Sequence, residues 1–220
     1  MSASNTALKW GDVPDWFYPA AEALMRALKV ADPETYHHCL RVGEMARKLA
    51  RESSLSEYEQ KIALFSGMFH DIGKMGIDKA ILYKPSHLDP KEKKIVEDHP
   101  LMSVEILNPL AYHSFVKNLI PGVRHHHERI DGLGYPDKLV DDEIPLTARL
   151  VMVVDTFDAM SQNRVYRKGL PTDIIYDELK RYSGIQFDPQ LVKIFLDAHK
   201  TWKQADTDLE VSALITRKIA

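Results

Sequence analysis

Three consecutive histidines, His125, His126 and His127, are followed in the chain by an acid and the turn-forming stretch DGLGYP. A histidine triplet by itself is most often a polar surface feature, so the rest of the chain must indicate its chemistry. The chain has ten histidines and 32 acidic residues but a single cysteine, Cys39. Nitrogen and oxygen ligands without thiolates suit Fe, Mn, Zn, Co or Ni better than a structural zinc site. The residue types therefore suggest a metal centre.

A candidate ligand outside the triplet is His38, in the segment ETYHHCLRVGEMARKLA. Helical spacing puts His38 on one face with apolar residues, whereas the neighbouring His37 falls among charged residues. We therefore expect His38 to point inward and His37 outward. Glu34 precedes His38 by one turn on the same side. For this pair alone, a core histidine bonded to a neighbouring acid is the simpler interpretation, because a buried charge needs a partner.

The segment ALFSGMFHDIGK places His70 and Asp71 side by side, followed by a glycine and a lysine. On a helix, His70 lies above the small residues Ala63, Ser66 and Gly67, which would let another helix or a site come close. The pair offers one nitrogen and one oxygen ligand. A histidine–aspartate pair is common by chance, so its meaning depends on the other candidates.

Two acids, Asp155 and Asp158, interrupt the apolar stretch LTARLVMVVDTFDAMSQ. A carboxylate on an apolar helical face either caps a buried amide or meets a cation. Periodicity does not choose between the two acids. On a helix, His126 and His127 would project about 100° apart. Such a pair can reach different parts of one site or face two metal ions.

Helices are predicted along most of the chain, and they must position these side chains. The predicted helices cover Pro14 to about Ala31, Asp32 to about Ser53, Ser56 to near Gly73, part of PSHLDPKEKKIVEDHP, SFVKNLIPGVRHHHER with a break at Pro121, LTARLVMVVDTFDAMSQ, Thr172–Tyr182 and Pro189–Trp202. Asp32 and Ser56 are expected to cap the helices they begin, Ser56 with Glu59 at the capping-box spacing. IDGLGYPDKLVDDEIP is predicted to be a long loop. The fold class is therefore all-α.

The overall composition is that of an ordinary globular chain, with 45% hydrophobic and 28% charged residues. A net charge of -3 and aromatic residues that are not interleaved with basic ones argue against binding to nucleic acid. No apolar run is long enough to span a membrane, and MSASNTALKW lacks the features of a signal peptide. The single cysteine excludes an intrachain disulfide, so we expect a cytoplasmic location.

Three parts are expected along the chain: an N-terminal arm and first helix over residues 1–31, a catalytic domain over 32–202 and a C-terminal tail over 203–220. The end of the tail, VSALITRKIA, is apolar enough to pack on a second subunit, so a homodimer is one expectation.

As a set, the motifs resemble the HD-GYP family, a branch of the HD phosphohydrolases. The matching stretches follow the family's order from about Asp32 to Leu196. They are DPETYHHCLRV, FHDIGKMGI, ILYKPSHLDPKE, EDHPLMSVEIL, HHERIDGLGYP, VVDTFDAM, RVYR and GIQFDPQLV. The combination of HDIGK with HHExxDGxGYP is the most specific part. The resemblance implies an HD-type helical bundle with a GYP loop.

The resemblance also implies a set of functional residues. The implied metal ligands are Glu34, His38, His70, Asp71, His99, His126, His127 and Asp155. The implied catalytic residues are His70, Asp71 and Lys74, and the implied substrate-binding residues are Lys74, Tyr135, Arg164 and Arg167. The match selects His38 over His37 and Asp155 over Asp158, and it leaves His125 outside the ligand set.

In the implied arrangement, Asp71 bridges two ions. His38, His70 and Asp155 would hold one ion, and the other three histidines would hold the second. Glu34 would either ligate a third ion or orient His38. Two or three divalent ions are therefore expected, with iron or manganese favoured and zinc, nickel or cobalt as alternatives. The sequence departs from the family pattern at Ser103, Val165 and Cys39, none of which is a ligand position.

The implied reaction is hydrolysis of the bacterial second messenger cyclic di-GMP to pGpG, and in some family members on to GMP. Cyclic GMP-AMP is an alternative substrate, whereas nucleotidases and dNTP hydrolases of the wider superfamily would not need the GYP loop. Tyr135 would lie near the mouth of the site, with simple packing as the alternative. A cyclic-dinucleotide receptor without activity is another alternative, although receptors often lose ligands and all eight are present here. The GYP loop is also linked in the family to contact with GGDEF-domain cyclases.

Overall fold

The computed structural model describes residues 13–162 and 168–202, and these residues form helices without a strand. The α-helices are α1 (Phe17–Ala31), α2 (Pro33–Glu52), α3 (Glu57–Phe69), α4 (Lys79–Leu82), α5 (Pro90–Glu97), α6 (His99–Leu107), α7 (Ser114–Arg124), α8 (Leu146–Ser161), α9 (Thr172–Arg181) and α10 (Pro189–His199). Short 3₁₀-helices are η1 (Ile72–Gly76), η2 (Asn108–Leu110) and η3 (Asp141–Glu143). The predicted all-α fold class is confirmed.

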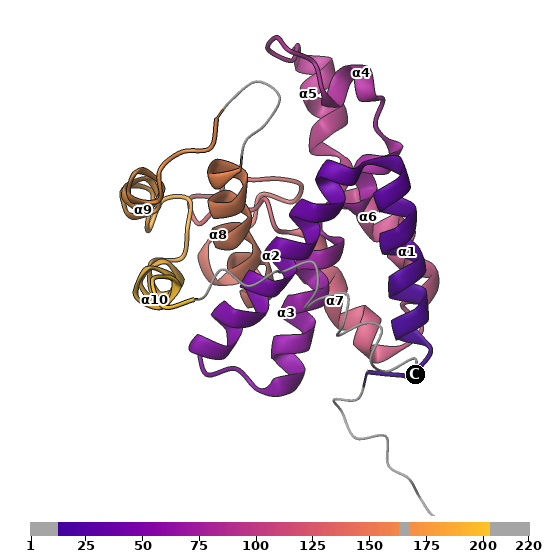
Figure 1. The fold of residues 1–220 in the computed structure, drawn as a ribbon, viewed down its shortest axis with the longest axis horizontal. Helices are drawn as coiled ribbons and strands as arrows, with labels where there is room; N and C mark the ends of the chain where they lie inside the picture. The colour runs from indigo at the N-terminus through magenta and orange to yellow at the C-terminus, as the bar shows by residue number, and fades with distance from the viewer. Residues whose placement is uncertain (1–12, 163–167, 203–220) are drawn as a thin grey trace, which may run out of the picture.

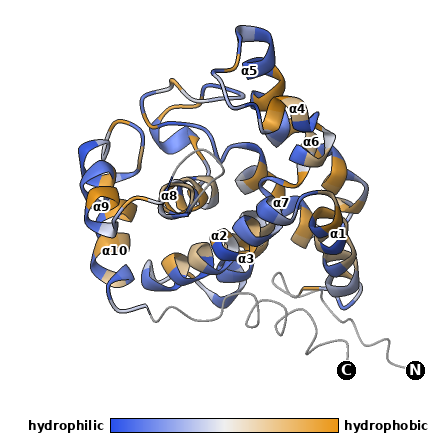
Figure 2. Cartoon of the chain, turned by 45° about the horizontal axis from the view of Figure 1, so that its top comes forward, coloured by the Kyte–Doolittle hydropathy of each residue, from blue (hydrophilic) through white to orange (hydrophobic). Residues whose placement is uncertain are grey.

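Helix α2 lies at the centre of the molecule, between two hydrophobic clusters. On one side it packs with α1 and α3, with α7 behind α3, and on the other it packs with α8 and α10, with α9 against α8 (Figure 1). Leu40 of α2 belongs to the first cluster, and Val42 and Leu49 belong to the second. The helices carry hydrophobic and hydrophilic residues on the same element (Figure 2), as amphipathic helices around a shared core do.

The expected caps of the two central helices are present. The Asp32 carboxylate accepts a hydrogen bond from the Thr35 amide at the start of α2. Ser56 and Glu59 form the reciprocal capping box at the start of α3. These local signals place the starts of the helices well because capping depends only on neighbouring residues.

Helix α3 ends at Phe69, earlier than the predicted end near Gly73, and the chain tightens into η1. The cause is a serine 30 residues away. The Ser103 hydroxyl accepts a hydrogen bond from the Gly73 amide and donates one to the His70 carbonyl. Both backbone groups would otherwise have continued the α-helix, so His70 and Asp71 lie just past its end.

The predicted break at Pro121 is wrong, because α7 continues through this proline and ends at Arg124. Phe115, Leu119 and Val123 of α7 are fully buried, so tertiary packing holds the helix on both sides of the proline. The expectation that His126 and His127 project from a helix is wrong as well. Both residues follow the end of α7 in a turn.

Some expectations lie outside the described residues, namely the N-terminal arm before residue 13, Arg164, Arg167 and the tail from residue 203. The division at residue 31 stays a prediction. Phe17 and Leu28 of α1 are buried in the same cluster as residues of α2, α3 and α7. None of the helices in the described ranges is long and apolar enough to cross a membrane.

Candidate metal centre and adjoining pocket

Seven of the eight predicted ligands come together as two groups of side chains. One group contains His38 from α2, His70 from the end of α3 and Asp155 from α8. The other contains Asp71, which precedes η1, and three histidines, His99, His126 and His127. In each group the ligand atoms lie within 4.8 Å of one another. Five separate segments of the chain therefore build one centre.

A close crossing of α2 and α3 brings His38 and His70 together. The two helices approach at Gly43 and Gly67, where a Cβ atom on Gly67 would lie 2.8 Å from the Cα atom of Gly43. The rings of His38 and His70 have centroids 5.2 Å apart. The expectation that small residues below His70 admit another helix is confirmed.

Asp71 lies between the two groups and turns one oxygen to each. Its Oδ1 is 3.0 Å from Nε2 of His99. Its Oδ2 is 3.4 Å from Nε2 of His70 and 3.6 Å from Nε2 of His38. A carboxylate in this position can serve two ions at once.

The backbone fixes which ring nitrogen carries the proton in the neutral form of three of the histidines. His70, His99 and His126 each place Nδ1 2.6 to 2.7 Å from the carbonyl oxygen three residues earlier. A carbonyl only accepts, so Nδ1 must carry the proton, and in the neutral ring Nε2 presents a lone pair to the site. Hydrogen bonds of this kind orient metal-ligating histidines in many proteins.

Several buried nitrogen and oxygen atoms of the centre can accept a hydrogen bond, but few hydrogen-bond donors lie near them. His70 Nε2 and Asp71 Oδ1 are buried without a hydrogen-bond partner. Although His99 Nε2 lies close to Asp71 Oδ1, the His99 tautomer gives it no proton to donate. Nε2 of His99 also lies 3.2 Å from Nε2 of His126. Unpaired buried acceptors are costly, and divalent cations would satisfy them, so these donor sets fit metal ions bound through nitrogen and oxygen.

The pKa values also reflect a demand for positive charge. Burial alone would raise the pKa of Asp71 and lower that of His70. Their mutual attraction outweighs burial, so the pKa of Asp71 lies well below its usual range and that of His70 well above it. Burial, with repulsion from neighbouring histidines, holds the pKa of His126 well below its usual value and that of His127 at about 3. His126 and His127 are therefore neutral and ready to act as ligands at pH 7.

Asp158, the acid that the motif match left out, contacts the other side of His38. Its Oδ2 accepts a hydrogen bond from Nδ1 of His38 at 2.7 Å, while Nε2 of His38 faces Asp155 at 3.0 Å. Arg41 forms a bidentate ion pair with Asp158. Sequence reasoning held Asp158 only as a rival to Asp155 for one position and did not predict that both contact His38. The signal was available: Arg41 follows His38 by one helical turn, and Asp158 follows Asp155 by one.

The remaining predicted residues occupy different places. Lys74 pairs with Asp71 Oδ2, so its ammonium group is at the centre. Glu34 is exposed and belongs to neither ligand group, so its role as a ligand stays a prediction. His125 is bound to Asp137 at 2.8 Å and likewise belongs to neither group. His37 is half-buried and outside both groups.

The GYP loop is held over the centre by a buried acid that sequence reasoning overlooked. Glu128 is 2% exposed, and its two oxygens accept hydrogen bonds from the amides of Asp137 and Leu139. Gly134 lies so close to this turn that a Cβ atom there would be 2.5 Å from the Glu128 Cα atom. Tyr135 stacks on the candidate ligand His127, with ring centroids 4.8 Å apart. The loop therefore places an aromatic ring directly on the metal centre.

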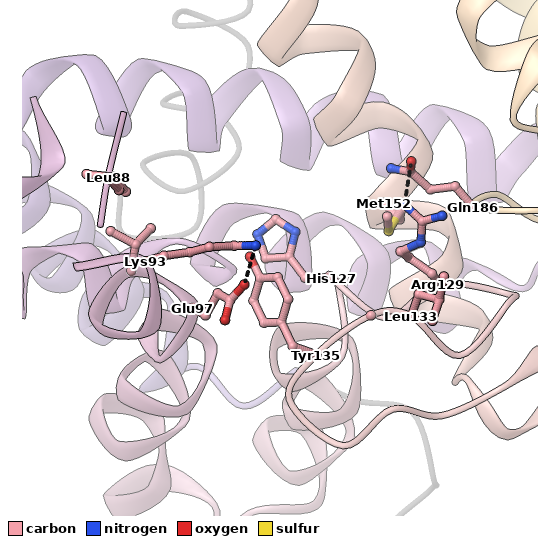
Figure 3. Close-up of a pocket in the computed structure, with 11 residues that line it drawn as sticks. Leu88, Lys93, Glu97, His127, Arg129, Leu133, Tyr135, Met152 and Gln186 are labelled. Carbon is pink, nitrogen blue, oxygen red and sulfur yellow. Dashed lines mark hydrogen bonds and ion pairs between the residues drawn. The ribbon is translucent and has the colours of Figure 1, made fainter. Parts of the chain in front are cut away.

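A pocket of about 380 Å³ opens beside His127 (Figure 3). This volume lies within the range of small-ligand sites. The pocket is lined by Leu88, Lys93, Val96, Glu97, His127, Arg129, Leu133, Gly134, Tyr135, Met152 and Gln186. Sequence reasoning found only His127 and Tyr135 among these residues, because the others come from separate helices and loops that no local pattern brings together.

The comparisons with known proteins agree with this geometry. The model of the HD domain family matches residues 22–191. A cyclic di-GMP phosphodiesterase of Thermotoga maritima is 35% identical over 187 residues, covering 84% of this chain and 50% of the relative. The 3'3'-cGAMP-specific phosphodiesterase 2 of Vibrio cholerae is 34% identical over 174 residues, covering 79% of this chain and 33% of the relative. The chain thus spans about half or less of the length of these curated relatives.

A solved structure shares the fold. The crystal structure of cyclic GMP-AMP specific phosphodiesterases of Vibrio cholerae superposes with a TM-score of 0.65 at 16% identity, covering 92% of this chain and 53% of the other. The chain belongs to the HD domain family, as its motifs predicted. Its curated relatives act, by name, on cyclic dinucleotides that contain guanine.

Proposed function

We propose that this chain is a metal-dependent phosphodiesterase that hydrolyses cyclic di-GMP, releasing pGpG or GMP. The observation that carries the proposal is Asp71, which turns one oxygen to each of two groups of buried ligands. A two-ion centre suits a phosphodiester because the substrate is anionic and repels hydroxide. The names of the Thermotoga, Pseudomonas and Xanthomonas relatives, each 35% identical, support the choice of substrate.

The side chains of the protein would have distinct parts in this reaction. When bound, two divalent ions would neutralise phosphate charge and lower the pKa of the attacking water. We propose iron or manganese as the bound metal, because the ligands are nitrogen and oxygen atoms. Lys74, held beside Asp71, would stabilise negative charge that develops on the phosphate. Arg164 and Arg167 are proposed to contact phosphate or guanine. Tyr135 would close the site above His127.

Cyclic GMP-AMP is the second candidate substrate. Two Vibrio relatives that are 34% and 36% identical to this chain carry names specific for this dinucleotide. Both molecules contain guanine and two phosphodiesters, so the metal centre alone does not distinguish between them.

Further parts of the proposal concern the setting of the enzyme. A GGDEF-domain partner at the GYP loop is supported by the family resemblance and by Leu133, which is 75% exposed at this loop. A homodimer and a cytoplasmic location also remain proposals, based on the apolar C-terminal stretch and the single cysteine.

The test is anaerobic purification, metal analysis and identification of products from cyclic di-GMP and cyclic GMP-AMP. We expect turnover in the metal-loaded protein. Asp71→Ala should abolish turnover and lower the metal content, because this carboxylate faces both groups. His125→Ala is the matched control, since His125 adjoins the ligand histidines but pairs with Asp137. Binding without turnover by metal-loaded wild type would identify a receptor, and normal metal content and rate in Asp71→Ala would overturn the two-ion centre.

A further inference from the structure

The pocket beside His127 contains one carboxylate, that of Glu97, which is the last residue of α5. The rest of its lining is apolar, aromatic, amide or basic, and Figure 3 shows Glu97 and Tyr135 together in it. An acidic group thus lies next to the aromatic ring that covers the metal centre.

Glu97 is the more buried member of an ion pair. Its Oε1 lies 3.6 Å from Nζ of Lys93, one turn earlier in α5. The Glu97 side chain is 28% exposed, whereas the Lys93 side chain is 69% exposed. Both side chains line the pocket, and Figure 3 shows the Lys93 ammonium group beside His127 and Tyr135, with the Glu97 carboxylate paired to it.

A carboxylate in this place is unfavourable for binding an anion. A phosphodiester beside Glu97 would be repelled, so the acid calls for a substrate group that carries hydrogen-bond donors. Guanine offers two adjacent donors, N1–H and the N2 amino group, which match the two oxygens of a carboxylate. Adenine presents a lone pair at N1 on the same edge and would be repelled.

We propose that the pocket receives a guanine base of the substrate and that the Glu97 carboxylate binds its N1–H and N2 amino edge. This inference rests on the proposed hydrolysis of a guanine-containing cyclic dinucleotide and assigns its base specificity to one residue. Met152 and Leu133 supply apolar surface for the flat faces of the base. Arg129 pairs with Asp131 through Nε and Nη2, and its Nη1, 3.4 Å from Gln186, is a donor that can meet the N7 acceptor on the far side of the base.

The same helix provides a matched control. Lys94 and Asp98 form an ion pair at 2.9 Å with the same spacing as Lys93 and Glu97, one residue further along. Asp98 does not line the pocket. A general effect of removing an acid near the centre would therefore appear in Asp98→Ala as well.

The experiment compares kcat/KM for cyclic di-GMP and cyclic di-AMP in metal-loaded wild type, Glu97→Ala, Glu97→Gln and Asp98→Ala. We expect Glu97→Ala to lower the preference for the guanine substrate by about 10- to 100-fold, the usual range for one bidentate base contact. Glu97→Gln should move the preference further toward adenine, because an amide can donate to N1 and accept from the N6 amino group. Asp98→Ala should keep the wild-type ratio, and all four proteins should hold the same metal.

The outcomes separate this inference from the proposed function. If wild type hydrolyses cyclic di-GMP and the ratio is unchanged in both Glu97 variants, the base-binding role is wrong and the function stands. If no protein hydrolyses either substrate, the function is wrong, and the affinities for GMP and AMP still test Glu97. Equal loss of GMP affinity in Glu97→Ala and Asp98→Ala would also overturn the inference.

Discussion

His38 lies between two acids that make different contacts with it. Asp155 faces Nε2, the nitrogen on the metal side, and Asp158 binds Nδ1 on the far side. Helical periodicity left the choice between these acids open because they lie one turn apart. The contacts show that both are used, and that Asp158, anchored by Arg41, can hold the ring in one orientation.

Asp158→Asn should weaken metal binding by roughly 10- to 100-fold while every ligand stays in place. The amide can still accept the hydrogen bond from His38, but it loses the charge that makes the ring a better ligand. Metal titration of the apoprotein measures the change. Glu44→Gln is the control, because Glu44 is also a buried acid of this core, paired with Arg47 away from the ligands. An unchanged affinity in Asp158→Asn would show that Asp158 serves stability alone.

Glu34 can be tested by counting ions. It is exposed and in neither ligand group, so, in contrast to the ligand role that the motif match implies, we expect about two ions per chain in both wild type and Glu34→Gln. Metal analysis of anaerobically prepared protein gives the count. A count of three that falls to two in Glu34→Gln would instead establish a third ion at this position, one turn before His38.

At the scale of elements, the crossing of α2 and α3 determines how closely His38 and His70 approach each other. Gly67 contacts the backbone of Gly43, and its carbonyl oxygen also receives the hydrogen bond from His70. One residue thus sets both the distance between the helices and the orientation of a ligand.

Gly67→Ala should lower the free energy of unfolding by about 1–3 kcal/mol, because the added methyl group meets backbone that cannot rotate away. The same displacement should weaken metal binding. Chemical denaturation and metal titration measure the two effects. Gly76→Ala is the control, since a Cβ atom there would meet only the Met102 sulfur at 3.4 Å. Wild-type values for both quantities in Gly67→Ala would show that the two helices can separate without cost.

The sequence predicted the helices and their caps because these depend on spacing within each segment, whereas the grouping of the ligands was implied by the resemblance to the HD-GYP family. It misplaced the end of α3 because the Ser103 hydroxyl, which arrives from α6, takes the backbone groups of that turn. It broke α7 at Pro121 because burial of the surrounding apolar residues is a tertiary effect. The hydrogen bonds of Glu128 to the GYP loop and the position of Glu97 in the pocket were missed for the same reason, because both depend on tertiary contacts.

For the whole molecule, the free energy of unfolding depends on both hydrophobic clusters, one on either side of α2. The outer edge of the second cluster contains His199, whose ring packs on Phe157 and Phe195 and whose Nδ1 accepts a hydrogen bond from the Tyr176 hydroxyl. Burial and the nearby charge of Lys48 lower the pKa of His199 to about 4. The ring is therefore neutral in the folded protein over most of the pH range in which it would be protonated when unfolded.

Stability should consequently fall as the pH drops from about 6.5 to about 4. In this window the unfolded chain binds a proton at His199 that the folded protein does not bind, so acid favours unfolding, and the contribution is fully present only above about pH 6.5. His199→Gln should make the free energy of unfolding less dependent on pH across the window, as measured by urea denaturation at several pH values. The exposed His87, changed to Gln, is the control. Equal pH dependence in wild type and His199→Gln would show that His199 titrates alike in both states.

The ligands of the two groups run from His38 to Asp155, so the centre closes only when distant parts of the chain have met. During synthesis, the stretch from the end of α3 through α6 to the turn after α7 emerges before α8, and it brings all four members of the Asp71 group. The first group must wait for Asp155 on α8. A nascent chain that stops before α8 would therefore present one complete ligand group and one incomplete group, and could take up a single ion before it is able to hold a pair.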